Sequence, residues 1–242
     1  MRRAIFLLFS TTFAYADMLG GEISAGFYAH TLDGTSTYQA SNRVDFEDTL
    51  GFSGTQDIFF KAYIEHPVPL IPNIRLAYNS LSYDGKSLVP SFSWGKIEHF
   101  TGELENTLSL DYTDITLYYE LLDNWIELDG GISFRSINGD LTIASRLETE
   151  SISYSDRVPM AYGKAKFYIP STDISLQGEI NFMPFGSTTS YDMELSARYT
   201  FDLGLGVELG YKSFYLESDT LAKSFTSELK VSGAYASVVW DF

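Results

Sequence analysis

Three histidines are the residues of this 242-residue sequence best suited to acid–base chemistry. His30 precedes Asp33 by three residues, His99 adjoins Glu98, and His66 lies in a proline-rich segment. A histidine beside a carboxylate can activate a hydroxyl nucleophile for hydrolysis or acyl transfer. No G-x-S-x-G, H-E-x-x-H or phosphate-loop motif accompanies them. A surface role is the simpler interpretation of these histidines, so we predict no catalytic residues.

Acidic side chains supply a second candidate chemistry, because carboxylates can bind Ca²⁺ or Mg²⁺. The acidic residues that we place in predicted loops are Asp45, Glu47, Asp48, Glu148, Glu150, Asp156, Glu217 and Asp219. Their spacing matches no defined calcium loop, so we interpret them as solvated charge. The sequence has no cysteine, which removes thiol chemistry and cysteine metal sites. We therefore predict no cofactor and no metal site.

Charged residues that alternate with apolar ones form the third set. Residues 191–201 (YDMELSARYTF) alternate without interruption, which predicts a strand with one apolar and one polar face. Similar alternation occurs near 22–30, 56–66, 73–83, 106–122, 125–137, 159–169, 173–183, 204–216 and 228–242. The apolar phase changes within 106–122, from Leu108 and Leu110 to Ile115 and Leu117. This change predicts a β-bulge near Thr113 and Asp114.

The connections between these segments alternate between short and long. Short turns are predicted at 65–73, 121–125, 168–173 and 201–204, and long loops at 31–55, 84–105, 138–157, 184–190 and 217–227. This arrangement is typical of outer-membrane barrels, with the long loops outside the cell. We predict an all-β fold: a single antiparallel transmembrane β-barrel of about ten strands, with eight as the alternative. A soluble sandwich or lipocalin would show a similar alternation with the faces exchanged.

The polar faces of such a barrel would line its lumen. The predicted lumen charge network contains Arg75, Asp111, Glu127, Asp129, Arg135, Lys164, Lys166, Glu179, Glu194, Arg198, Glu208 and Lys212. A narrow barrel filled with such long side chains should be closed or conduct very little.

The first residues read as a secretory signal peptide. Arg2 and Arg3 precede a short apolar run, and Ala14-Tyr15-Ala16 fits a cleavage site, so we expect a signal peptide at 1–16 and a barrel domain at 17–242. The apolar run is too short to span a bilayer as a helix. Cleavage would leave 14 basic against 32 acidic residues, a net charge of −18, which argues against nucleic-acid binding.

Aromatic residues mark the predicted strand ends. Trp125, Tyr168, Phe201 and Trp240 adjoin predicted short turns, as a periplasmic aromatic girdle would. General strand propensity is the competing explanation. Trp240 and Phe242 resemble the C-terminal signal read by the barrel-assembly machinery, although Ser237 stands where that signal usually has glycine.

Several segments together resemble small bacterial outer-membrane β-barrels. The resemblance is to uncharacterised barrels with a Gly-Gly pair after the signal peptide, carried here by Gly20-Gly21 and by segments 44–52, 65–73, 118–132, 158–170 and 210–219. It implies an outer-membrane location and supplies no catalytic residues.

The sequence therefore predicts a monomeric, non-enzymatic outer-membrane barrel in contact with outer-membrane lipid and lipopolysaccharide. Its expected role is envelope structure, surface interaction or limited passage of small solutes. The alternative is a rim enzyme, a hydrolase or acyltransferase, acting through His30 or His99 on envelope lipids or peptides.

Overall fold

The computed structural model describes residues 20–39, 41–68, 70–183 and 188–242. The strands are β1 (Gly20–Tyr38), β2 (Val44–Asp45), β3 (Thr55–Glu65), β4 (Asn73–Trp94), β5 (Ile97–Asp123), β6 (Ile126–Ser145), β7 (Thr149–Tyr168), β8 (Ile174–Met183), β9 (Thr188–Thr200), β10 (Leu205–Ala222) and β11 (Phe225–Asp241). A short 3₁₀ turn, η1 (Asp202–Gly204), precedes β10. Within these residues, no helix is long and apolar enough to cross a membrane. The predicted signal peptide lies outside the described residues.

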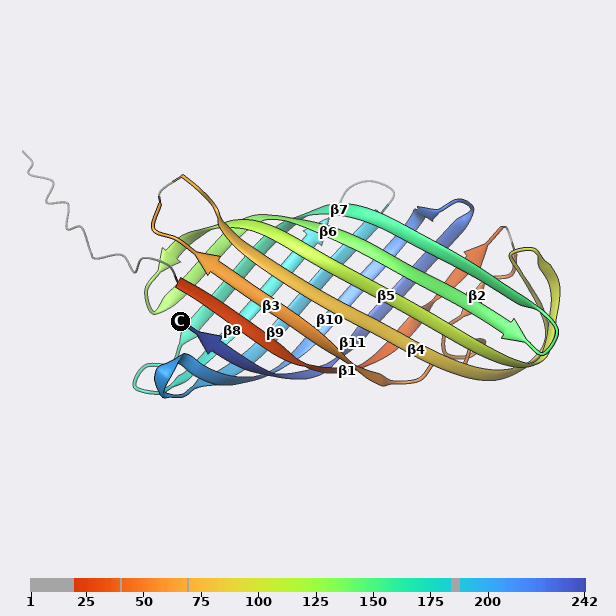
Figure 1. The fold of residues 1–242 in the computed structure, drawn as a ribbon, viewed down its shortest axis with the longest axis horizontal. Coiled ribbons are helices and arrows are strands. Elements are labelled where there is room, and N and C mark those ends of the chain that lie inside the picture. The colour runs from red at the N-terminus through yellow and green to blue at the C-terminus, as the bar shows by residue number, and fades with distance from the viewer. Residues whose placement is uncertain (1–19, 40, 69, 184–187) are drawn as a thin grey trace, which may run out of the picture.

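The strands form one closed antiparallel barrel (Figure 1). Neighbours in sequence pair with each other, and β1 pairs with β11 from Glu22↔Asp241 to Tyr38↔Phe225, which closes the wall. Of the eleven strands, β2 has only two residues and pairs on β1, so ten long strands make the barrel. Closure satisfies the backbone groups that an open sheet edge would expose to lipid. The predicted ten-stranded barrel is confirmed.

Strand length sets the height of the barrel. A tilted strand needs only about 9–11 residues to cross a bilayer, whereas β5 has 27 residues and β4 has 22. The extra length lies at the end opposite Gly20 and Phe242, where the β4–β5 and β6–β7 hairpins extend (Figure 1). The regions 84–105 and 138–157, predicted as long loops, are therefore mostly strand.

The outer face of these strands changes character partway along. On β5, Ile115 and Leu117 point outward beside exposed apolar neighbours, while Ser109 and Thr107 occupy the same face farther along. On β6, exposed Phe134 is followed on the same face by Asn138. The hydrogen-bonded row from Leu76 through Ile115 and Phe134 to Pro159 has no charged member, and the row from Ser80 through Asp111 and Asn138 to Ser155 is polar. An apolar belt thus gives way to a polar outer wall.

The predicted bulge near Thr113 and Asp114 is absent. β5 keeps a continuous register there against both β4 and β6, and its even-numbered residues stay inside from Leu104 to Tyr118. The apolar phase changes because the surroundings change. Toward the end with the β4–β5 and β6–β7 hairpins, here called the upper end, the interior is apolar. Toward the end with Gly20 and Phe242, the exterior is apolar. A strand that passes from lipid to water can change its apolar face without changing its register.

Candidate functional site

The interior of the apolar-belt level is filled by ion pairs that cross the barrel. Lys61 on β3 pairs with Glu194 on β9, and Arg75 on β4 pairs with Glu179 on β8. These strands are not neighbours in the sheet, so each pair spans the lumen. All four side chains are buried. The pairs therefore occupy the cross-section through which a solute would pass.

Arg135 on β6 pairs with carboxylates from two other strands. Its guanidinium binds both carboxylate oxygens of Asp114 at 2.7 Å and reaches Asp192 on β9 at 2.8 Å. The guanidinium also lies 4.2 Å from the ring centroid of Tyr112 and 5.3 Å from that of Phe214. Bidentate pairing and ring contacts fix a planar guanidinium more firmly than a single ion pair would.

Lys212 and Arg198 extend the network toward β10 and β1. Lys212 lies 2.9 Å from Glu194 and donates to Asn79 Oδ1 at 2.6 Å. Arg198 binds Glu22 at 2.6 and 2.8 Å and also donates to Glu208. Tyrosine hydroxyls complete the carboxylate shells, as where Tyr235 donates to Glu208 at 2.6 Å and Tyr63 donates to Glu179 at 2.7 Å. Such shells offset the cost of removing these charges from water.

A looser acidic mouth opens at the end near Gly20 and Phe242. Lys164 lies 3.7 Å from Asp129, and Lys166 lies 3.7 Å from Glu127. The mouth encloses about 180 Å³, and its lining also includes Glu65, Glu120, Asp123 and Asp241. Among the residues described, no group of three or more histidine or acidic residues is arranged to hold a metal ion. In the predicted acidic loops, Asp45 instead accepts the backbone N–H groups of Glu47 and Asp48.

Above the charged layer the interior is an apolar core. Four of its side chains are at most 3% exposed: Leu81, Leu108, Ile137 and Leu141. The cluster continues to Trp94 near the upper end. A further group from the segment after β1 joins this core: Val44, Phe46, Leu50 and Phe52. Asn106 donates to the Leu50 carbonyl at 2.7 Å, which ties this segment to the inner face of β5.

Tyr154 places a hydroxyl group inside the apolar core. Burial raises the pKa of the Tyr154 hydroxyl, with Asp140 and Asp111 adding to the shift, and this hydroxyl donates to the Ser109 carbonyl at 3.4 Å. The ring of Tyr154 stacks on Phe225 with centroids 5.6 Å apart. The upper interior is therefore packed like the core of a soluble protein and forms a second closure above the ion pairs.

Eleven of the twelve residues predicted for the lumen network lie on inner faces. Asp111 is the exception: it alternates with the buried Leu110 and Tyr112 and lies on the polar outer wall. The structure places Asp114 inside instead, against Arg135. The predicted bulge left Asp114 out of the set of inward residues. Uninterrupted alternation, in which every even-numbered residue from Tyr112 to Tyr118 points inward, would have included it.

The predicted girdle residues divide between two faces. Trp125 is exposed beside Phe167, with ring centroids 5.5 Å apart, and Trp240 lies on the outer face. Phe201 is exposed and contacts Tyr199. Tyr168 differs from the prediction, because its hydroxyl donates to Glu127 and its ring lies by Lys166 at the acidic mouth. Tyr168 therefore belongs to the lumen side rather than to the outer girdle.

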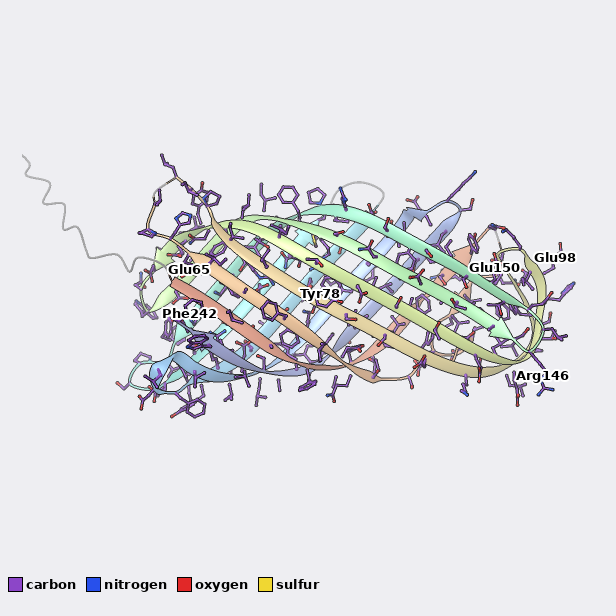
Figure 2. All side chains as sticks on the ribbon, in the orientation of Figure 1. Glu65, Tyr78, Glu98, Arg146, Glu150 and Phe242 are labelled. Carbon is purple, nitrogen blue, oxygen red and sulfur yellow. The ribbon has the colours of Figure 1, made fainter. Side chains whose placement is uncertain are left out.

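Phe242 packs against Gly21 at the start of β1. Gly21 N–H donates to the Phe242 carbonyl at 2.9 Å, and Phe242 N–H donates to the Gly21 carbonyl at 2.8 Å. A Cβ at Gly21 would come within 2.8 Å of the Phe242 ring. Trp240 adds a ring contact with Phe242 at 4.9 Å between centroids. Gly21 thus leaves the space in which this aromatic ring sits. Figure 2 labels Phe242 at this end of the barrel.

The three histidines do not share a site. His30 is buried on β1, with Nε2 3.3 Å from Asp57 and Nδ1 2.5 Å from the Tyr83 hydroxyl. Ser82 is close by, but its hydroxyl donates to Asp57 at 2.9 Å rather than to the imidazole. Its backbone N–H also donates to Asp57, at the level where β3 no longer pairs with β4. This arrangement ties two strands together and does not align a serine with His30.

The other two histidines lie elsewhere. His66 accepts the Val68 N–H at Nδ1 and lies 3.2 Å from the Pro72 carbonyl, within the turn between β3 and β4. His99 is exposed on β5 near the far tip of the molecule.

Comparison with known proteins supports the fold. No family model and no curated protein matches the sequence. Among solved structures, the outer membrane protease OmpT from Escherichia coli is 13% identical over 93% of this chain and 97% of that chain, with a TM-score of 0.57. Ail, the attachment invasion locus protein of Yersinia pestis, is 8% identical over 93% of this chain and all of that chain, with a TM-score of 0.41.

A third match is the translocator domain of the autotransporter NalP from Neisseria meningitidis. It is 16% identical over 92% of this chain and 88% of that chain, with a TM-score of 0.41. At 13% identity, the likeness to the OmpT structure shows the fold alone. The chain has the closed antiparallel β-barrel architecture of Gram-negative outer-membrane proteins.

Proposed function

We propose that this protein is a sealed, non-enzymatic barrel of the outer membrane that presents a rigid β-structure at the cell surface. The observation that carries the proposal is the double closure of its interior. Ion pairs such as Lys61–Glu194 and Arg75–Glu179 cross the lumen at the level of the apolar belt. An apolar core that includes Leu141 then fills the barrel above them.

Strand length supports the surface role. The strands of a simple membrane plug could end at the lipid boundary, yet β4 to β7 each have 20 or more residues. Beyond the belt they carry polar side chains outside and apolar side chains inside, which is the pattern of a water-exposed β-structure. The extended part of these strands would serve recognition at the surface rather than transport through the wall.

Solute entry into liposomes tests the closed state. The refolded protein is reconstituted into liposomes, and swelling in a small sugar or amino acid is compared with protein-free liposomes and with liposomes that contain an open porin. We expect swelling no faster than in the protein-free sample. Swelling that approaches the porin rate and depends on protein dose would contradict the proposal and favour solute passage.

A further inference from the structure

One strand edge at the far end of the barrel has no partner. β5 pairs with β6 only as far as Leu104↔Ser145, whereas its pairing with β4 continues through two register shifts to Trp94↔Ile97. Over 97–103, the backbone groups facing away from β4 form no backbone hydrogen bond with any residue that the structure describes. Unpaired N–H and C=O groups on a strand edge are a template for another strand.

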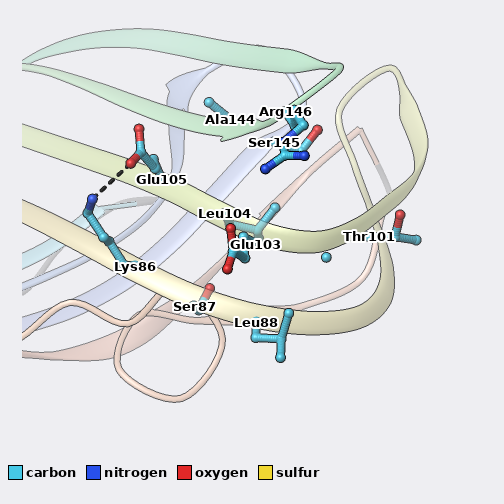
Figure 3. A pocket seen from close by; sticks show the side chains of 11 residues that line it. Lys86, Ser87, Leu88, Thr101, Glu103, Leu104, Glu105, Ala144, Ser145 and Arg146 are labelled. Atoms are coloured by element: carbon cyan, nitrogen blue, oxygen red, sulfur yellow. Dashed lines mark hydrogen bonds and ion pairs between the residues drawn. The ribbon is translucent and has the colours of Figure 1, made fainter.

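The bend that frees this edge is built into the strand. Gly102 has a φ of +84°, in the region that disfavours L side chains, and a Cβ there would meet nothing within 4 Å. Figure 3 shows Thr101 on this bend, well apart from Ser145 and Arg146 at the end of β6. The gap is a groove of about 1050 Å³ lined by β4, β5 and the end of β6.

The edge is held rigid by the opposite face of its hairpin. Phe100 and Trp94 are buried, and the rings of Phe92 and Phe100 stack with centroids 5.4 Å apart. The β4 side of the hairpin is covered, because Ser93 N–H and Oγ both donate to Asn42 at 2.9 Å. Only the β5 side is left open among the described residues. A rigid edge loses little conformational entropy when a strand is added.

The charges along the edge select its partner. Glu98 and Glu103 are exposed and form no ion pair with any described residue. Glu105 is already satisfied, since Lys86 donates to it at 2.8 Å and this hydrogen bond lowers the pKa of Glu105. Pairing two copies of this edge would bring its carboxylates together, and like charges on facing strands are destabilising. Basic side chains on an incoming strand would instead face Glu103.

We propose that the free edge of β5 at residues 97–103 binds an extended, basic polypeptide segment as an added β-strand. This inference rests on the surface role proposed above and names the class of partner. Main-chain hydrogen bonds to the edge would provide affinity, and Glu103 would provide selectivity for a basic residue on one face of the added strand. Arg146, across the groove, disfavours basic side chains on the far side of the added strand.

A short peptide of alternating lysine and valine is the probe. Its binding to the refolded full chain is measured by fluorescence anisotropy, beside the same peptide with alternate N-methyl groups that block one hydrogen-bonding edge. We expect binding of the first peptide only. Hydrogen exchange should slow at residues 98–103 and not at other strand ends.

Charge reversal supplies the matched variants. Glu103→Lys should weaken binding about tenfold or more, whereas Asp219→Lys, an equal charge change at the exposed β10 tip, should not. Absence of binding to a correctly folded barrel, equal binding of the N-methylated peptide, or equal loss in both variants would overturn the proposal. Self-association that protects residues 98–103 without peptide would also overturn it, in favour of a second copy of the chain.

These outcomes are separate from the test of the closed barrel. A barrel that admits no solute and binds no peptide would contradict only the proposed edge site. A barrel that admits solute and binds the peptide would contradict only the proposed closed interior.

Discussion

At the scale of single residues, the account depends on buried charges that satisfy one another. Arg135 pairs with two carboxylates from different strands, Asp114 and Asp192, and Arg75 also lies 3.8 Å from Asp114. Burying one charge without its partner is far more costly than burying the pair. The lumen residues should therefore behave as coupled groups rather than as independent ones.

Arg135→Met should destabilise the barrel strongly, because Asp114 and Asp192 would lose their shared cation. We expect a loss of about 3–5 kcal/mol in the free energy of unfolding. Urea unfolding in lipid vesicles, followed by tryptophan fluorescence, measures it. The matched control is Arg157→Met, an exposed arginine on the outer face of β7. Equal losses in the two variants would show that the Arg135 cluster does not stabilise the barrel.

A second residue-scale prediction concerns the apolar core. Leu141→Ala should leave a cavity at a fully buried position and cost about 2–5 kcal/mol. Leu147→Ala, at an exposed position in the β6–β7 turn, is the control. The same urea titration compares them, and a cost at Leu141 no larger than at Leu147 would contradict a packed upper interior.

At the scale of elements, the long strands pass from lipid to water without a change of register. The chain contains no cysteine, so a spin label attaches only at a single introduced cysteine. A label at Ile115→Cys should be more accessible to oxygen, and a label at Asp111→Cys should be more accessible to a water-soluble nickel complex. Electron paramagnetic resonance measures both. If both labels were more accessible to the same reagent, the boundary between lipid and water that we place between Ile115 and Asp111 would be contradicted.

The closing seam gives another element-scale prediction. Gly21→Val should hinder closure of β1 on β11, because its side chain would occupy the place of the Phe242 ring. The control is Gly20→Val, where a Cβ would meet its nearest atom, Glu65 Oε2, at an ordinary 3.5 Å. The fraction of heat-modifiable, compact protein after refolding reports closure. Equal fractions for the two variants would contradict the role of Gly21.

Sequence periodicity predicted the barrel well where one face meets lipid. The alternation in 191–201 and the number of such segments correctly indicated ten paired strands. It failed where the strand leaves the apolar belt, since apolar residues there belong to the inside. The phase change at Leu110 and Ile115 therefore looked like a bulge, and Asp111 was assigned to the wrong face.

The site was predictable only as a set of inward charges. Pairing across the lumen, such as Lys61 with Glu194, depends on the order and curvature of strands far apart in sequence. The free β5 edge was hidden for a similar reason. Residues 97–103 fell in a predicted loop, and the lack of a partner follows from where β6 ends rather than from any local motif.

At the scale of the whole molecule, two closures in series separate this barrel from an open pore. The ion pairs fill the level of the apolar belt, and the apolar core fills the level above it. Neither closure depends on a flexible lid, because both are formed by side chains of the barrel wall and by the packed segment that includes Leu50. Under the proposed function, the surface available to a partner is the outside of the upper barrel.

Single-channel recording in a planar lipid bilayer tests this central claim most directly. The refolded chain is inserted after heat-modifiable migration has confirmed a folded barrel, and current is recorded over a range of voltages. The account predicts a baseline without discrete steps. Reproducible unitary currents from the folded protein, absent from a mock preparation, would contradict a sealed interior and assign the lumen charges to conduction.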